Sequence, residues 1–342
     1  MVRLARNAMA TRFEILLPGE DVVSLRAAGE EALDEIERLE AQLSLFKPAS
    51  EISRLNTRAA REPVRVTPAV FSLLEHAKRL TEQTGGAFDV TIAPLVRCWG
   101  FMGGAGQLPR PEELAAARES VGMHLVHLDP GQFTVRFERT GVMIDLGAIG
   151  KGYAIERAVD ILREAGVDSA LLHGGTSTVY GLGHPAEADD WKVEIPSPQR
   201  AALASAEQRS LSCDDTRELV PRKPFATVSL CDASLSVSAV WGKYFTANGC
   251  TYGHIIDPRT GQPANRAVLS AVALDSATET DALSTALLTV GPDGHDQIVA
   301  LRPGIRTLVA ADAEGSRVAS CGISFTSSAQ KVAGNATDPN NQ

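Results

Sequence analysis

The chain has few cysteines and no cysteine pairing motif. Among its 342 residues there are five cysteines, and none of them forms a C-x-x-C pair. They are Cys98, Cys213, Cys231, Cys250 and Cys321. The odd count and the scattered spacing argue against a zinc site or a disulfide framework and favour a reducing compartment.

Long apolar runs are also missing. No stretch approaches the roughly 18 uninterrupted apolar residues that indicate a membrane-spanning helix. The first ten residues contain two arginines but no continuous apolar segment of the kind found in secretory signals. We therefore expect no membrane partner and, for the sequence as given, a cytoplasmic location.

Positive charge is in the minority. Lys and Arg number 33 against 42 Asp and Glu, which gives a formal net charge of −9. Proteins that bind nucleic acid usually present a basic face, so this balance argues against a nucleic-acid partner. An acidic protein can still bind a nucleotide when a local positive group or a metal offsets the repulsion.

The chain shows no internal repeat, and its helical and strand-like segments mix irregularly. Apolar periodicity predicts helices over 22–46, 67–86, 151–165 and 280–290, while alternation or short apolar runs predict strands at 133–137, 142–144, 170–172 and 269–273. This order favours an α+β fold over a regular βαβ alternation. We expect one catalytic domain over residues 1–323, with an irregular excursion at about 184–226 and a disordered tail over 324–342.

Three hydroxyl and carboxyl residues stand at helical spacing near the C-terminal end. Asp281, Ser284 and Thr285 are three and four residues apart, so on a helix they share one face. Hard oxygen ligands of this kind suit magnesium, which completes its shell with water and substrate phosphate. The structural alternative is that Asp281 only complements the helix N-terminus and the hydroxyls are incidental.

A glycine-rich turn between a strand and a helix runs from Asp145 to Lys151. Glycines let the backbone approach a phosphate, the helix N-terminus favours anions, and Lys151 adds positive charge. The turn is neither G-x-G-x-x-G nor a Walker A loop, so an ordinary strand-to-helix turn is an equally good interpretation.

Two further segments carry polar groups beside apolar ones. His254 precedes Ile255, Ile256 and the turn sequence D-P-R-T-G, and it is either a satisfied structural histidine or a general base or phosphate contact. Asp89 follows Ala87 and Phe88 in a glycine-rich loop, where it could hold a planar heterocycle or simply end a helix before a core strand.

The order of these segments along the chain resembles the FAD:protein FMN transferase family, also called the ApbE family. The matching blocks are Met9–Thr11, Ser44–Phe46 with Ser50–Asn56, Gly86–Asp89 with Pro94–Phe101, Asp145–Ala154, His254–Gly261 and Asp281–Ala286. The resemblance spans residues 9–291. It implies a compact α+β domain with mixed or antiparallel sheets flanked by helices.

The resemblance also implies a site for FAD and Mg²⁺. Matched by position, the metal ligands would be Asp281, Thr285 and the main-chain carbonyl of Ala148, with Ser284 as an addition. The flavin nucleotide would contact Met9, Phe46, Ala87, Phe88, Asp89, Asp145, Lys151, His254, Ile255 and Ile256. Phe46 replaces a frequent tyrosine of the family, which removes one hydrogen-bonding group.

The implied reaction is the transfer of FMN from FAD to a threonine or serine hydroxyl of an acceptor flavoprotein, with release of AMP. Lys151 would assist at the phosphates, and we hypothesise that His254 accepts the proton of the hydroxyl. Two alternatives stay open: an FAD pyrophosphatase of the same fold, and a non-catalytic FAD carrier. Asp275–Thr278 resembles an acceptor sequence, but beside the metal helix we interpret it as a structural turn.

Overall fold

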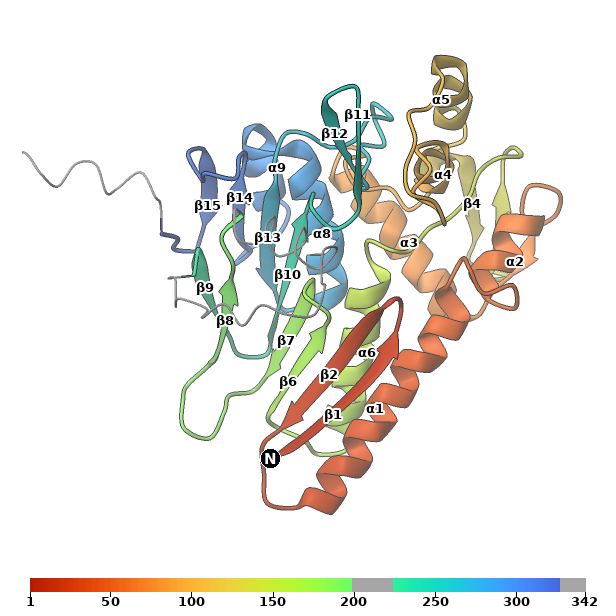
Figure 1. Cartoon of the computed structure of the whole chain (residues 1–342). Helices are drawn as coiled ribbons and strands as arrows, with labels where there is room; N and C mark the ends of the chain where they lie inside the picture. The colour runs from red at the N-terminus through yellow and green to blue at the C-terminus, as the bar shows by residue number, and fades with distance from the viewer. Residues whose placement is uncertain (199–223, 327–342) are drawn as a thin grey trace, which may run out of the picture.

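A large antiparallel sheet organises the molecule (Figure 1). The structure, a computed structural model, describes residues 1–198 and 224–326. Eight strands pair in the order β1-β2-β6-β7-β10-β13-β14-β15, and each neighbouring pair is antiparallel. Their bounds are β1 Val2–Ala8, β2 Thr11–Leu17, β6 Ala170–Gly174, β7 Thr178–Leu182, β10 Ala233–Ala239, β13 Leu269–Leu274, β14 Arg306–Ala310 and β15 Val318–Cys321. The α+β class is confirmed.

Helices α1, α6 and α8 pack together against one face of this sheet (Figure 1). They span Val22–Leu43, Gly150–Glu164 and Ala277–Val290. The other α-helices among residues 1–198 and 224–326 are α2 Glu51–Arg58, α3 Pro68–Gln83, α4 Ala93–Cys98, α5 Pro111–Arg118 and α9 His295–Val299. The predicted helices at 22–46, 67–86, 151–165 and 280–290 are therefore present, the last one starting three residues earlier because Ser276 caps it.

Three small sheets complete the described part of the fold. The first is β3-β5-β4, with bounds Val64–Arg65, Thr134–Phe137 and Val126–Asp129. The hairpin β11–β12 spans Tyr244–Ala247 and Cys250–Gly253. Strands β8 and β9 span Trp191–Ile195 and Ala226–Leu230 and pair with each other.

Both faces of the large sheet are buried at its centre. On β13, Val272 belongs to the main core beneath the helices, whereas Leu269, Ala271 and Ala273 face a second core shared with β8 and β9. The alternation of residues 269, 271 and 273 therefore predicts the strand correctly, and the two faces of this strand pack into two different cores. This double burial fixes the strands that hold the site.

The prediction of a strand at 142–144 is wrong. The segment Val142–Ile144 is not part of a β-sheet in the structure. The side chain of Asn56 replaces a neighbouring strand, because its Nδ2 donates to the Ile144 carbonyl at 2.9 Å and its Oδ1 accepts from the Ile144 amide at 2.8 Å. An apolar triplet predicts burial correctly here but not the pairing of its backbone.

Two of the predicted irregular regions contain ordered structure. Within 184–226, strand β8 is regular, while residues 199–223 lie outside the described part of the chain. At the start of the predicted tail, Phe325 bridges to Ala226 and packs its ring against Phe225. The predicted irregular excursion therefore contains a regular strand, and residues 324–326 are ordered although the sequence predicts them to be part of a disordered tail. Residues 327–342 lie outside the described range.

Across residues 1–198 and 224–326, no helix is both long and apolar enough to cross a membrane.

Candidate functional site

Helix α8 carries the first half of the site. It begins after Ser276, whose side chain accepts from the Glu279 amide, and it passes through the molecule almost entirely buried. Ser284 Oγ donates to the Asp281 carbonyl at 3.0 Å, and Thr285 Oγ1 lies 3.4 Å from the same oxygen. The predicted common face of Asp281, Ser284 and Thr285 is present, one turn into the helix.

The turn before α6 carries the second half. Asp145 Oδ1 accepts from the Gly147 amide at 2.8 Å, which closes the turn, and Lys151 Nζ donates to the Gly147 carbonyl at 2.9 Å. Burial raises the pKa of Asp145, although the Gly147 amide and the charge of Lys151 oppose the shift. Ala148 lies in this same turn, directly after Gly147.

The two halves meet through Asp281. Helix α6 has no side-chain cap of its own, and Asp281 Oδ2 supplies one by accepting from the Gly152 amide at 3.0 Å. A Cβ added at Gly152 would lie 2.1 Å from the Ala277 carbonyl oxygen, so glycine is required for the helices to approach this closely. Asp281 complements a helix N-terminus after all, but that of α6 rather than its own.

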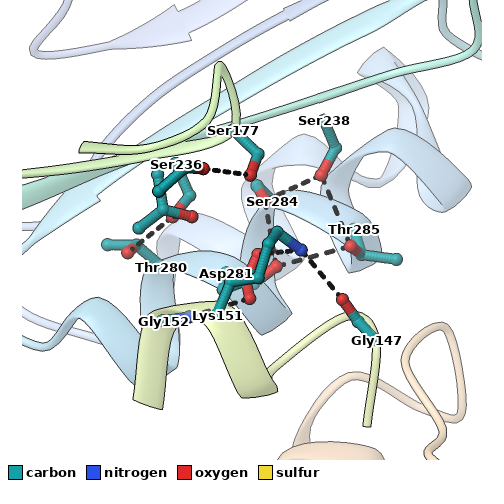
Figure 2. A network of polar contacts seen from close by, with 12 residues as sticks. Gly147, Lys151, Gly152, Ser177, Ser236, Ser238, Thr280, Asp281, Ser284 and Thr285 are labelled. Atoms are coloured by element: carbon teal, nitrogen blue, oxygen red, sulfur yellow. Dashed lines mark hydrogen bonds and ion pairs between the residues drawn. The ribbon is translucent and has the colours of Figure 1, made fainter. Parts of the chain in front are cut away.

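Lys151 and Asp281 form the charged centre of the site (Figure 2). Lys151 Nζ lies 3.7 Å from Asp281 Oδ1, and their side chains are 22% and 5% exposed. The structure thus brings together the predicted residues Asp145, Lys151, Asp281, Ser284 and Thr285 from two segments more than a hundred positions apart.

The oxygen set suits a hard divalent cation. The described residues contain no group of three His, Cys, Asp or Glu side chains arranged for a metal. Asp281 is a single buried carboxylate, with the hydroxyls of Ser284 and Thr285 one turn away, and Lys151 lies between it and the Gly147 carbonyl of the turn before α6. Few protein ligands, all of them oxygens, are typical of magnesium sites that rely on water and substrate phosphate.

His254 follows strand β12 and is partly buried. Its Nδ1 lies 3.1 Å from the Lys243 carbonyl oxygen, and its ring meets Phe101 edge-on with centroids 6.4 Å apart. Burial lowers the pKa of His254, and the charges of Lys243 and Lys151 lower it further, while the backbone hydrogen bond opposes them. The backbone of Lys243 and the ring of Phe101 thus position this histidine.

The residues after His254 serve mainly as structure. Ile256 is buried in a small cluster with Trp99 and Phe101, and Ile255 packs partly against the main core. Asp257 binds the guanidinium of Arg259 through both carboxylate oxygens, at 2.9 and 2.8 Å, and so closes the turn. Their contact with a flavin nucleotide stays a prediction.

The segment 87–89 lies beside the glycine-rich turn, because the Asp145 amide donates to the Val90 carbonyl at 2.7 Å. The side chains of Ala87 and Phe88 are buried in the main core. Asp89 accepts from the Thr91 amide and hydroxyl and from the Met123 amide, while burial raises its pKa against these bonds. Their side chains therefore fix the loop, and a role at FAD stays a prediction.

Met9 and the turn that holds Phe46 are joined by one carboxylate. Glu40 accepts from the Met9 amide at 2.8 Å and from Lys47 Nζ at 2.6 Å. Met9 has a positive φ of 50° in the β1–β2 turn, and Phe46 is 68% exposed. Met9 and Phe46, two of the predicted flavin contacts, therefore lie near the same carboxylate at one edge of the molecule. The aromatic ring of Phe46 is open to solvent.

A hollow of about 340 Å³ lies next to this edge. Leu45, Asn56, Arg97 and Met143 are among the residues that line it, and neither Asp281 nor Lys151 belongs to the lining. The hollow and the charged centre are therefore separate features of the structure.

Ser238 belongs to the site but was not among the predicted residues. It lies at the end of β10, and its hydroxyl is hydrogen bonded to Ser284 at 2.8 Å and lies 3.4 Å from Thr285 Oγ1 (Figure 2). The signal in the sequence is the serine at every second position from Ser234 to Ser238, which places all three on the strand face toward α8.

The acceptor-like sequence Asp275–Thr278, interpreted from the sequence as a structural turn, forms a bend at Asp275 and the capped start of helix α8. Glu156 Oε2 accepts from Ser276 Oγ at 2.7 Å and from the Thr278 amide at 2.9 Å. The Thr278 side chain is only 2% exposed, so its hydroxyl is inaccessible to an incoming flavin phosphate.

Comparison with known proteins agrees with this arrangement. The model of the ApbE family matches residues 9–309. Proteins named FAD:protein FMN transferase from Vibrio cholerae and Treponema pallidum are 31% and 30% identical, covering 85% and 83% of this chain and 82% and 77% of their own lengths.

Solved structures show the same fold. The ApbE protein of Thermotoga maritima superposes with a TM-score of 0.79 at 26% identity, covering 96% of this chain and 98% of its own. The flavinyl transferase ApbE of Pseudomonas stutzeri, in its apo form, gives 0.75 at 25% identity, with 94% of each chain covered. From the family match along nearly the whole chain and the shared fold, we conclude that this chain belongs to the ApbE family.

Proposed function

We propose that this chain is an FAD:protein FMN transferase, as its curated relatives are named. One observation carries the proposal: a lysine at a helix N-terminus and a buried aspartate on a second helix meet across a glycine-rich turn. Such a centre suits a pyrophosphate, since the lysine and the helix N-terminus attract its negative charge. The substrate is FAD, and the acceptor is a threonine or serine of a flavoprotein.

The proposed reaction is one phosphoryl transfer. The acceptor hydroxyl oxygen bonds to the phosphorus on the FMN side of the pyrophosphate, and the bond from that phosphorus to the bridging oxygen breaks. AMP leaves with that oxygen. Catalysis of this kind depends mainly on positioning and on neutralising charge, which Lys151 and the amides of the 145–152 segment would supply.

Asp281, Ser284, Thr285 and the carbonyl of Ala148 would hold the cation that such a reaction needs. Their oxygens fit magnesium, and a bound Mg²⁺ would neutralise charge on the pyrophosphate and on the departing AMP. Ser238 would act on the same ligands by orienting the hydroxyls of Ser284 and Thr285.

His254 is the proposed general base. Its Nδ1 lies 3.1 Å from the Lys243 carbonyl oxygen and 3.3 Å from the Lys243 amide nitrogen, and we propose the tautomer in which Nδ1–H donates to the carbonyl. In that tautomer Nε2 is the acceptor for the proton of the incoming hydroxyl. Its lowered pKa keeps the ring neutral at physiological pH, which is the form that a base requires. The exposed ring of Phe46, the Met9 edge and the 87–89 loop would contact other parts of FAD.

The test is to incubate the protein with FAD and a flavoprotein domain that bears an acceptor threonine, with and without Mg²⁺. AMP is followed by chromatography and the acceptor by mass spectrometry. Magnesium-dependent AMP together with an FMN-modified acceptor supports the proposal. AMP with FMN in solution would mean that water replaces the hydroxyl, and bound FAD without AMP would mean a carrier.

The base assignment is tested with His254→Ala. We expect the rate of transfer at saturating FAD and Mg²⁺ to fall on the order of 100-fold, the usual size of a general-base contribution. The matched control is His184→Ala, an exposed histidine in the loop after β7, which should keep the full rate.

The pH profile gives an independent check. Because the pKa of His254 is lowered from 6.5, the rate of the unchanged protein should fall only as the pH drops below that value. This decline should be absent in His254→Ala. Full turnover in the variant, or the same decline in both proteins, would contradict the assignment.

A further inference from the structure

Lys151 is bound between a carbonyl and a carboxylate rather than extended into solvent. Its Nζ donates to the Gly147 carbonyl at 2.9 Å and lies 3.7 Å from Asp281 Oδ1, with only 22% of the side chain exposed (Figure 2). An ammonium group thus occupies the space between the turn before α6 and the carboxylate of α8. These are the same two elements that offer oxygens to a metal.

The two oxygens of Asp281 have different partners. Oδ2 accepts from the Gly152 amide at 3.0 Å and is committed to capping α6. Oδ1 faces Lys151 at 3.7 Å, which is beyond hydrogen-bond length, so charge alone holds this pair. The Oδ1 atom is therefore the oxygen that a second cation can reach without breaking the joint between the helices.

We propose that Lys151 and a divalent cation are alternative partners of Asp281. In the metal-free protein the ammonium balances the buried carboxylate, and a bound cation displaces it, since two positive charges repel each other at one carboxylate oxygen. The released ammonium is then free for the pyrophosphate, a step that rests on the proposed function. Metal binding would thus release Lys151 from Asp281 before Lys151 contacts the pyrophosphate.

Burial explains why the carboxylate needs this substitute. Asp281 is 4% exposed, and a buried charge without a partner is strongly unfavourable. A metal that binds Asp281 must first displace Lys151, and the free energy of that displacement lowers the observed affinity for the metal. Replacing Lys151 by a neutral residue should tighten metal binding to the FAD-free protein, by about tenfold if the coupling has the usual size.

Calorimetric titration of the FAD-free protein with Mg²⁺ is the first measurement. We expect Lys151→Met to bind Mg²⁺ about tenfold more tightly than the unchanged protein. Asp281→Asn, which keeps an acceptor for the Gly152 amide, should lose the binding. Should the methionine variant fold poorly by circular dichroism, Lys151→Gln replaces it in the same titration.

The second measurement observes the lysine itself. Acetylation by acetic anhydride, read by peptide mass spectrometry, should rise several-fold at Lys151 when Mg²⁺ saturates the protein. Lys192 on β8, whose side chain is 66% exposed, is the internal reference and should not respond. The response at Lys151 should be absent in Asp281→Asn.

The proposal is overturned when Mg²⁺ leaves the acetylation of Lys151 unchanged, when Lys151→Met binds Mg²⁺ no more tightly, or when the unchanged protein binds no Mg²⁺. Neither measurement contains FAD. A chain that exchanges Lys151 for Mg²⁺ but releases no AMP would therefore contradict only the proposed transferase activity, and the converse result would contradict only the exchange.

Discussion

Two acidic residues on the first turns of α8 have opposite surroundings. Glu279 receives the Arg302 guanidinium at 2.7 Å on each of its oxygens and lies 3.1 Å from His76 Nε2. Asp281, two residues later, has one backbone amide and a lysine held 3.7 Å away. The first carboxylate has a hydrogen-bonded cationic partner on each oxygen, whereas the second keeps an oxygen without a hydrogen-bonded cation.

The pKa of Glu279 reflects its pairing with His76 and Arg302. Burial raises its pKa, but His76 and Arg302 outweigh that effect and bring the pKa to about 2. It joins α3 and α8 through charge and is a structural residue. The comparison teaches that a buried acid with incomplete pairing at a helix joint indicates a binding role, while a fully paired neighbour on the same helix indicates stability.

The largest effect should come from the incompletely paired acid. Asp281→Asn removes the charge but retains an oxygen for the Gly152 amide, so we expect transfer to fall by on the order of 100- to 1,000-fold, as for the loss of a catalytic metal. The melting temperature should change little. AMP release from FAD at saturating Mg²⁺ and thermal unfolding measure the two quantities.

The matched control is Glu279→Gln on the same helix, assayed below its melting temperature. It should retain most of the activity because Glu279 faces α3 and Arg302 rather than Lys151. Equal losses of activity in Asp281→Asn and Glu279→Gln would contradict the assignment of a binding role to Asp281 and a structural role to Glu279.

An intermediate effect should follow from separating the two helices. Gly152→Ala would place a methyl group 2.1 Å from the Ala277 carbonyl oxygen, an atom of the backbone that cannot move aside alone. We expect the free energy of unfolding to fall by about 3 kcal/mol, the upper end for overpacking. Denaturant unfolding gives this value, and Mg²⁺ affinity should fall with it.

Gly150→Ala is the matched control in the same helix. There the added methyl group would meet only Leu146 Cβ, at an ordinary 3.7 Å. This variant should be as stable as the unchanged protein or slightly more so, since alanine favours a helix. If both variants unfold alike, the close approach of α6 and α8 is not what requires glycine.

The smallest of the three effects should come from the saturated acid. Glu279→Gln should lower the free energy of unfolding by about 2 kcal/mol at pH 7, allowing for partial solvent screening. The folded pKa of about 2 lies below the unfolded 4.5, so this stabilisation is complete above pH 4.5 and is lost as the pH falls toward 2.

Denaturant unfolding at several pH values tests this dependence. The difference between Glu279→Gln and the unchanged protein should shrink steadily below pH 4.5. Glu62→Gln is the control, because Glu62 forms an exposed pair with Arg58 and should contribute little at any pH. A difference that persists at pH 2 would show that Glu279 acts through packing rather than charge.

Much of the site was predictable because its residues follow local rules. Spacing placed Asp281, Ser284 and Thr285 on one helical face, and glycines followed by Lys151 marked a helix start. Ser238 was missed because the alternation of serines on β10 places it on one strand face but does not identify its partner 46 residues away. The wrong strand at 142–144 has the same cause, since Asn56 lies 88 positions from Ile144.

By itself, the sequence determined the four long helices α1, α3, α6 and α8, the α+β class, the order of family blocks and the residue types of the charged centre, because periodicity, caps and motifs act over a few residues. Only the tertiary structure decided that Asp281 caps α6, that Lys151 lies opposite its second oxygen and that Glu279 is saturated. Those outcomes depend on contacts between segments up to 203 positions apart. Packing of α3, α6 and α8 brings these groups together. A sequence pattern that spans a few residues cannot predict contacts between segments so far apart.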